Sequence, residues 1–149
     1  EALLLEALSD WQISIPEYGT VTAATPPIVI VTGNRSRELS DALRRRCLYA
    51  WIDYPGVAHE ARVLKARLPE IDAALAERIS RFLARVRGLD LVKQPGLSES
   101  LDWARALITV GASDLANERV PTTLAALVKD PTDIQALRRY WHELIDESA

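Results

Sequence analysis

The chain is poor in the residues that build covalent or metal-based scaffolds: its 149 residues include one cysteine, two histidines and no methionine. Because Cys47 has no second thiol to pair with, an internal disulfide is excluded. His59 and His142 lie too far apart in the sequence to form a metal-binding motif with that thiol, so no metal site is predicted. The lack of methionine, together with an opening helical stretch that has no capping residue, predicts a piece of a longer protein.

An excess of positive charge and an uninterrupted apolar span are also missing. With 18 basic and 21 acidic residues the net charge is -3, so the chain lacks the cationic field on which general nucleic-acid binding depends. Glu1, Glu6 and Asp10 interrupt the apolar residues at the start, which therefore match neither a signal peptide nor a membrane span. We predict a cytoplasmic protein with no nucleic-acid partner and no membrane span.

Residues 1–55 combine helical and strand patterns. Apolar positions over 3–11 recur at helical spacing. The segment over 11–23 alternates apolar and polar residues around the turn residues Pro16 and Gly19, which predicts a hairpin.

Two further strands are predicted on either side of a short helix. The unbroken apolar run over 28–31 is typical of a strand buried on both faces, and 47–54 has the composition of a second such strand. Ser36 or Ser40 can cap the helix between them. Residues 1–55 are therefore predicted to be part of a parallel α/β domain.

Residues 56–149 show only helical patterns. Apolar side chains recur at steps of three and four residues, for example at Leu75, Ile79 and Leu83, as in a helix that faces a core. Proline and glycine breaks divide this region into helices that we place at 56–68, 70–87, 98–111, 120–129 and 131–145. The predicted unit is an all-helical domain.

A resemblance to a known family is carried by PPIVIVTGNRSRELSDALRRRCLYAWIDYP at residues 26–55, by the hairpin before it, and by PGLSESLDWARAL at residues 95–107. These stretches resemble the C-terminal portion of a MoxR-type AAA+ ATPase, close to the accessory ATPases associated with carbon monoxide dehydrogenase maturation. The resemblance implies an α/β partial AAA+ core over residues 1–55, followed by an all-α helical lid over residues 56–149.

The same resemblance implies a function. The full-length protein would be an ATP-hydrolysing chaperone that forms a homo-oligomeric ring, a hexamer in the family pattern, and that remodels or matures a metalloenzyme with a von Willebrand factor A domain protein. ATP and Mg2+ would be bound mainly by residues upstream of Glu1, since this chain has no GxxxxGK loop followed by Ser or Thr and no apolar run ending in paired acids. The chain alone is predicted to be inactive.

Asn34, after the apolar run over 28–31, resembles the sensor 1 residue of this family. An amide can donate and accept hydrogen bonds at once, and could hold the γ-phosphate or the attacking water in line. Without the family context, a simple turn after Gly33 is an equally good interpretation, because asparagine tolerates left-handed backbone geometry.

Arg44, Arg45 and Arg46 end the short helix. Arg46 resembles the arginine finger that one AAA+ subunit presents to the nucleotide of the next, and Arg45 is the second choice. A permanently charged guanidinium can stabilise charge on the phosphate oxygens. Successive helical residues point about 100° apart, so the three cannot all reach one phosphate. Surface arginines favoured by the helix dipole are the alternative interpretation.

The lid departs from the family pattern at sensor 2, where the helix begins with LSES instead of an arginine. Either Ser98 caps this helix, with Glu99 or Leu101 nearby, or the sensing cation comes from elsewhere. Lys93 and Arg105 are the available cations for contact with the nucleotide.

Two predictions concern packing. Asp102 and Trp103 are expected to anchor their helix to the α/β domain, because a buried tryptophan supplies a large apolar area. The family sheet places a further strand between 28–31 and 47–54, and this chain lacks it. Residues 1–55 should therefore be loosely organised or leave a gap in the sheet, while the helical region should pack well.

Two other functions stay open. The helical region could be a non-catalytic protein-binding or assembly module, which would also fit the missing phosphate loop. A clamp-loader-like DNA role would account for the Arg46–Cys47 pair, but the acidic balance and the hairpin count against it.

Overall fold

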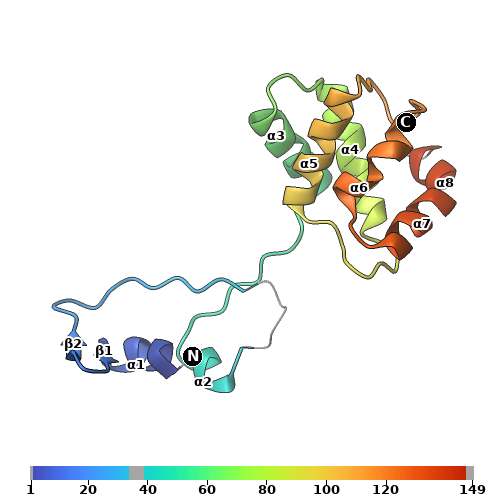
Figure 1. Cartoon of the computed structure of the whole chain (residues 1–149). Helices are drawn as coiled ribbons and strands as arrows, with labels where there is room; N and C mark the ends of the chain where they lie inside the picture. The colour runs from blue at the N-terminus through green and yellow to red at the C-terminus, as the bar shows by residue number, and fades with distance from the viewer. Residues whose placement is uncertain (1, 34–38, 147–149) are drawn as a thin grey trace. The chain divides into compact units, whose positions relative to one another are not determined.

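The computed structural model describes residues 2–33 and 39–146, within two units, Glu1–Ile52 and Asp53–Ala149 (Figure 1). This boundary lies close to the division between residues 55 and 56 expected from the sequence. The first unit mixes helices with a two-stranded sheet, whereas the described part of the second is helical.

The first unit begins with a helix that leads into a hairpin. The strands are antiparallel, with Ile13 opposite Val21, which confirms the predicted hairpin. Positive φ angles of 68° at Glu17 and 91° at Gly19 let the chain reverse direction between the strands. The described elements of this unit are α1 (Ala2–Asp10), β1 (Gln12–Ile15), β2 (Gly19–Thr22) and α2 (Asp41–Arg44).

The strands predicted over 28–31 and 47–54 are not formed, and this prediction is wrong. Both segments carry exposed apolar side chains, with 95% of Ile28 and 92% of Ile52 accessible to solvent. A strand is stable only when its backbone N–H and C=O groups pair with a neighbour, and the described residues offer no third strand. The first unit agrees instead with the expected loose organisation of residues 1–55.

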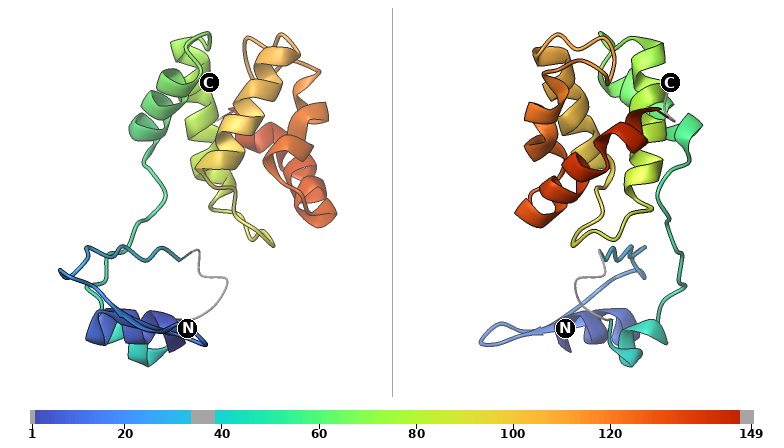
Figure 2. Two further views of the ribbon diagram at one scale, coloured as in Figure 1. Left: turned by 60° about the vertical axis from the view of Figure 1, so that its left-hand side comes forward. Right: turned by 90° about the vertical axis from the view of Figure 1, so that its right-hand side faces the viewer.

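The second unit is a bundle of short helices in which α4 packs against α3, α5 and α8 (Figure 2). The helices predicted over 120–129 and 131–145 each form as two pieces. The second break falls at Tyr140, which no proline or glycine marks in the sequence.

None of the described helices in either unit is long and apolar enough to cross a lipid bilayer. The bounds are α3 (Val57–Arg67), α4 (Ala73–Val86), α5 (Leu97–Thr109), the 3-10 helix η1 (Val120–Thr123), α6 (Leu124–Leu127), α7 (Pro131–Arg139) and α8 (Trp141–Asp146).

The core of the second unit is built on the apolar face of α4. Its positions from Leu75 to Val86 that recur at three and four residue steps are buried, as the spacing predicted. Phe82 packs against two tryptophans, and its ring centroid lies 4.9 Å from that of Trp103 and 5.4 Å from that of Trp141. Apolar burial contributes about 25 cal/mol per Å², and aromatic contacts of this kind add to it. All residues of the buried cluster belong to the second unit, which therefore carries its own core.

Candidate functional site

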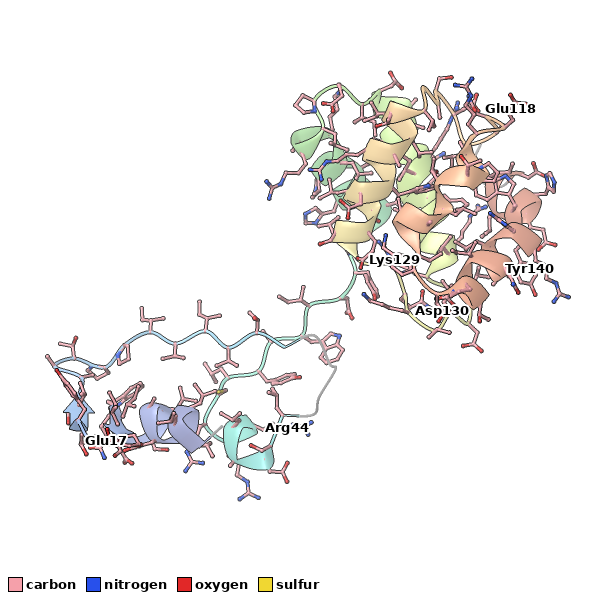
Figure 3. All side chains as sticks on the ribbon, viewed as in Figure 1. Glu17, Arg44, Glu118, Lys129, Asp130 and Tyr140 are labelled. Atoms are coloured by element: carbon pink, nitrogen blue, oxygen red, sulfur yellow. The ribbon has the colours of Figure 1, made fainter. Side chains whose placement is uncertain are left out.

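The helix α2 carries the arginine cluster at its C-terminal end. Ser40 begins this helix by accepting the backbone N–H of Leu43 at 3.4 Å, whereas Ser36, the other predicted cap, lies outside the described residues. The side chains of residues 44–46 are exposed, and Figure 3 marks Arg44. Positive charge is favoured at this end of a helix by the helix dipole. The cluster is therefore available to a partner outside this unit.

Arg46 is held by its own chain. Its Nε donates a hydrogen bond of 2.6 Å to Ser9 Oγ, and its Nη1 donates one of 3.0 Å to the Ala42 carbonyl oxygen. These bonds use two of the five N–H groups of the guanidinium, and neither partner is an acid. Within the described part of the chain, the side chains of Arg44 and Arg45 make no hydrogen bond or ion pair.

The other residues predicted to meet the nucleotide are Asn34, Lys93 and Arg105. Asn34 lies outside the described residues. Lys93 Nζ lies 3.3 Å from Glu99 Oε1, and Arg105 Nη1 lies 3.4 Å from Asp102 Oδ1. The two cationic side chains are 76% and 59% exposed, and ion pairs at such surfaces contribute at most about 1 kcal/mol. Each cation is a surface group beside an acid of its own unit.

A pocket of about 360 Å³ lies beside the start of α5. Figure 3 marks Lys129 and Asp130, which form one wall between α6 and α7. Lys129 Nζ donates to the carbonyl oxygens of Ala125 and Ala126 at 2.7 and 3.1 Å, and Asp130 Oδ1 accepts the Thr132 N–H at 2.8 Å. The pocket has the size of a small-molecule site, but these charged groups are already engaged in capping the two helices.

Asp133 fixes the loop that forms the opposite wall of this pocket. Its side chain is buried, and its carboxylate accepts the backbone N–H groups of Val92 at 2.8 Å and Lys93 at 3.2 Å. Two successive backbone donors around one carboxylate make a compact anion-binding arrangement. Through this contact α7 holds the loop between α4 and α5, a link that the sequence pattern did not reveal.

A buried ion pair joins α3 to the end of α4. Glu60 is fully buried, and Nη1 and Nη2 of Arg87 donate to its two carboxylate oxygens at 2.8 and 2.7 Å. Ser100 Oγ donates to Glu60 Oε1 at 2.6 Å, while Arg87 Nε donates to the Pro95 carbonyl oxygen at 2.9 Å. The sequence pattern did not reveal this cluster. One feature of the sequence could have indicated it. Glu60 lies four residues before Leu64, which is buried, so both residues lie on the same face of the helix.

The helix α5 begins after Gly96, so Ser98 is not its cap, and that one of the two predicted alternatives is wrong. Glu99 Oε2 accepts the backbone N–H of Gly96 at 3.1 Å, and Ser98 is exposed. Burial by itself would raise the pKa of the Glu99 carboxyl. Hydrogen bonds from its own backbone N–H, from Lys93 and from Gly96 outweigh burial and hold that pKa below its ordinary value of 4.5. Glu99 is therefore a capping acid of the fold.

Trp103 is buried inside the helical unit. Its Nε1 donates to Thr123 Oγ1 at 2.9 Å, and its ring packs on Phe82. The neighbouring Asp102 is exposed, beside Arg105. The expectation that this pair of residues anchors α5 to the α/β domain is wrong, because the indole is enclosed by residues of its own unit.

The metal-binding side chains and the comparisons with known proteins give no further evidence about function. In the part of the chain that the structure describes, no group of three or more His, Cys, Asp or Glu side chains could hold a metal ion. Comparison with protein-family models, curated proteins and solved structures finds no match for this chain. The MoxR resemblance therefore stays a prediction.

Proposed function

We propose that this chain is the sensor 1, arginine-finger and lid portion of an ATP-hydrolysing MoxR-type AAA+ chaperone that remodels or matures a metalloenzyme. One observation carries the proposal. The helix α2 presents exposed arginines at residues 44–46 between two apolar segments, 28–31 and 48–52, that have no sheet partner among the described residues. A separately packed helical unit follows. The C-terminal part of an AAA+ module without its other strands would have these features.

The apolar segments support the proposal because their exposure is costly. Ile28, Ile30 and Ile52 are 95%, 84% and 92% exposed. Burying one such side chain fully contributes about 1.5–3 kcal/mol, and soluble proteins rarely leave runs of this kind uncovered. A neighbouring strand with covering helices, as the resemblance implies, would pair the backbone and bury both faces.

The residues present fit only part of what ATP and Mg2+ would require. The chain has no phosphate loop, and its described residues hold no metal-ligand cluster. Bound ATP would supply the phosphoanhydride bond whose hydrolysis drives the protein, and residues outside this chain would hold most of it. This chain would contribute positive charge from α2.

Arg46 is the first candidate for the finger and Arg45 the second. Because Ser9 already orients the Arg46 guanidinium, that side chain loses little freedom when it meets a phosphate. Arg45 has no partner in the described part of the chain and would first have to be ordered. Lys93 and Arg105 would have to leave their acidic neighbours, so they are weaker candidates.

An arginine finger that acts on the nucleotide of a neighbouring subunit requires a homo-oligomeric ring. We propose a hexamer, with a von Willebrand factor A domain protein as partner and a metalloenzyme as client. These partners come from the family resemblance. The exposed hairpin, where Tyr18 is 83% accessible, is the candidate for transmitting motion to the ring pore.

The proposal is tested in a protein that carries this chain behind a phosphate loop. Arg46→Ala should lower ATP hydrolysis by on the order of 10³-fold, because the transition-state charge loses its partner. Arg44→Ala, on the same helix, is the matched control and should keep most of the activity. A second variant changes to Gln the catalytic glutamate of the acidic pair, the Walker B motif, which lies outside this chain. Mixing its subunits with Arg46→Ala subunits should restore part of the activity. In such mixed rings, some nucleotide sites combine an intact glutamate from one subunit with an intact Arg46 from the next.

Full activity in rings of Arg46→Ala and in rings of Arg45→Ala would overturn the finger assignment. The coding sequence upstream of Glu1 gives an independent check of the proposal. It should encode the phosphate loop and the acidic pair in the same open reading frame as this chain. A start codon at Glu1 would favour the second candidate function, a non-catalytic helical protein-binding or assembly module. The self-contained core of residues 53–149 is the observation that favours this second candidate.

A further inference from the structure

The chain just before α3 is held to the helical unit by a contact between an aromatic ring and a cation. Tyr54 precedes α3, and its ring lies over the guanidinium of Arg87, with Cζ 4.7 Å from the ring centroid. A guanidinium in this position is attracted by the negative face of the ring. The contact therefore ties the chain just before α3 to the end of α4.

Arg87 is a rigid anchor because its polar atoms are fixed from several sides. Glu60 binds it in bidentate fashion, Ser100 Oγ accepts from Nη2 at 3.2 Å, and the Pro95 carbonyl oxygen accepts from Nε. Only 7% of the Arg87 side chain is exposed. The plane of the guanidinium is thus set by α3, by α5 and by the loop before α5, independently of Tyr54.

Tyr54 itself is held less tightly than its anchor. Half of the residue, 51%, is exposed. The ring can therefore leave Arg87 without opening the buried cluster of the helical unit. A half-exposed ring on a fixed cation is an arrangement that can release locally.

We propose that Tyr54 is a releasable latch at the start of the helical unit. While its ring covers Arg87, residues 54–56 are fixed and the first turn of α3 closes on Gly56. When the ring leaves, the first turn of α3 opens, while the ion pair of Glu60 and Arg87 stays formed. The latch determines whether the first turn of α3 is closed or open, whatever the function of the whole protein.

Amide hydrogen exchange tests this latch in the full chain. The backbone N–H groups of His59 and Glu60 donate to the Gly56 carbonyl oxygen at 2.9 and 3.0 Å, so their exchange reports opening of the first turn. Tyr54→Ala should accelerate exchange at both amides by about 2-fold to 30-fold, the range that corresponds to the strength of such contacts. Tyr54→Phe keeps the ring face and should retain slow exchange.

The amide of Val128, bonded to the Leu124 carbonyl oxygen in α6, is the internal control and should not change in either variant. Equal exchange at His59 and Glu60 in the wild type and Tyr54→Ala would overturn the latch. So would an equal acceleration at Val128, which would show global destabilisation instead of local opening. Acceleration in Tyr54→Phe as large as in Tyr54→Ala would also overturn it, because the ring face would then not be responsible.

Discussion

At the scale of single residues, the buried pair of Glu60 and Arg87 should be the contact most sensitive to substitution. Arg87→Ala leaves the Glu60 carboxylate buried without its cation, and breaking such a pair costs about 3–5 kcal/mol. We expect this loss in the free energy of unfolding, measured by urea titration. Arg81→Ala is the control: Arg81 pairs with Glu77 at the surface, so we expect a change below about 1 kcal/mol.

A double variant separates the loss of the pair from the penalty of a lone buried charge. Glu60→Leu combined with Arg87→Met removes both charges and should recover most of the stability lost in Arg87→Ala. If Arg87→Ala alone stayed within about 1 kcal/mol of the wild type, the pair would not be what joins α3 to α4.

Glu99 should make the helical unit sensitive to acid. Its pKa is lowered in the folded chain, so the carboxylate favours the folded state above the ordinary pKa of 4.5. This contribution is lost as the pH falls through the folded-state pKa. The difference in unfolding free energy between the wild type and Glu99→Gln should therefore shrink from neutral pH toward pH values below the pKa. Denaturant titrations across this range measure it, and a constant difference would contradict the prediction.

At the scale of elements, α4 depends on the side chain that caps its start. Asp72 Oδ1 accepts the backbone N–H groups of Ala74 at 2.8 Å and Leu75 at 3.3 Å. Asp72→Ala removes this acceptor and should lower the free energy of unfolding by about 1 kcal/mol. Asp102→Ala, on the exposed face of α5, is the matched control with an expected change near zero. Thermal unfolding followed by circular dichroism compares them, and equal losses would contradict a role for the cap.

At the scale of the whole molecule, the second unit should fold without the first. Residues 53–149 contain the complete buried cluster, whereas residues 1–52 expose most of their large apolar side chains. A chain of residues 53–149 should therefore unfold cooperatively on heating, with a midpoint near that of the full chain. Residues 1–52 alone should show no cooperative transition. A gradual, non-cooperative melt of 53–149 would contradict the assignment of an independent core.

The sequence by itself determined the structure that depends on near neighbours. The hairpin follows from alternation around Gly19, and the first helix of the second unit forms at Val57–Arg67 where 56–68 was predicted. Ser40, which caps α2, was one of the two predicted caps, and exposed surface arginines were one of the two interpretations of residues 44–46. Helical spacing, caps and tight turns act within one or two turns of chain, so the residues that cause them are adjacent in the sequence.

Only the tertiary structure decided what depends on distant residues. The run over 28–31 has the composition of a buried strand, yet it stays unpaired because no neighbouring strand is present among the described residues. Arg46 meets Ser9 across 37 positions, and Arg87 meets Glu60 across 27. Spacing in the sequence carries no information about such pairs. Strand pairing, ion-pair burial and anchoring of a guanidinium each require a second group that only the folded chain brings within hydrogen-bond distance.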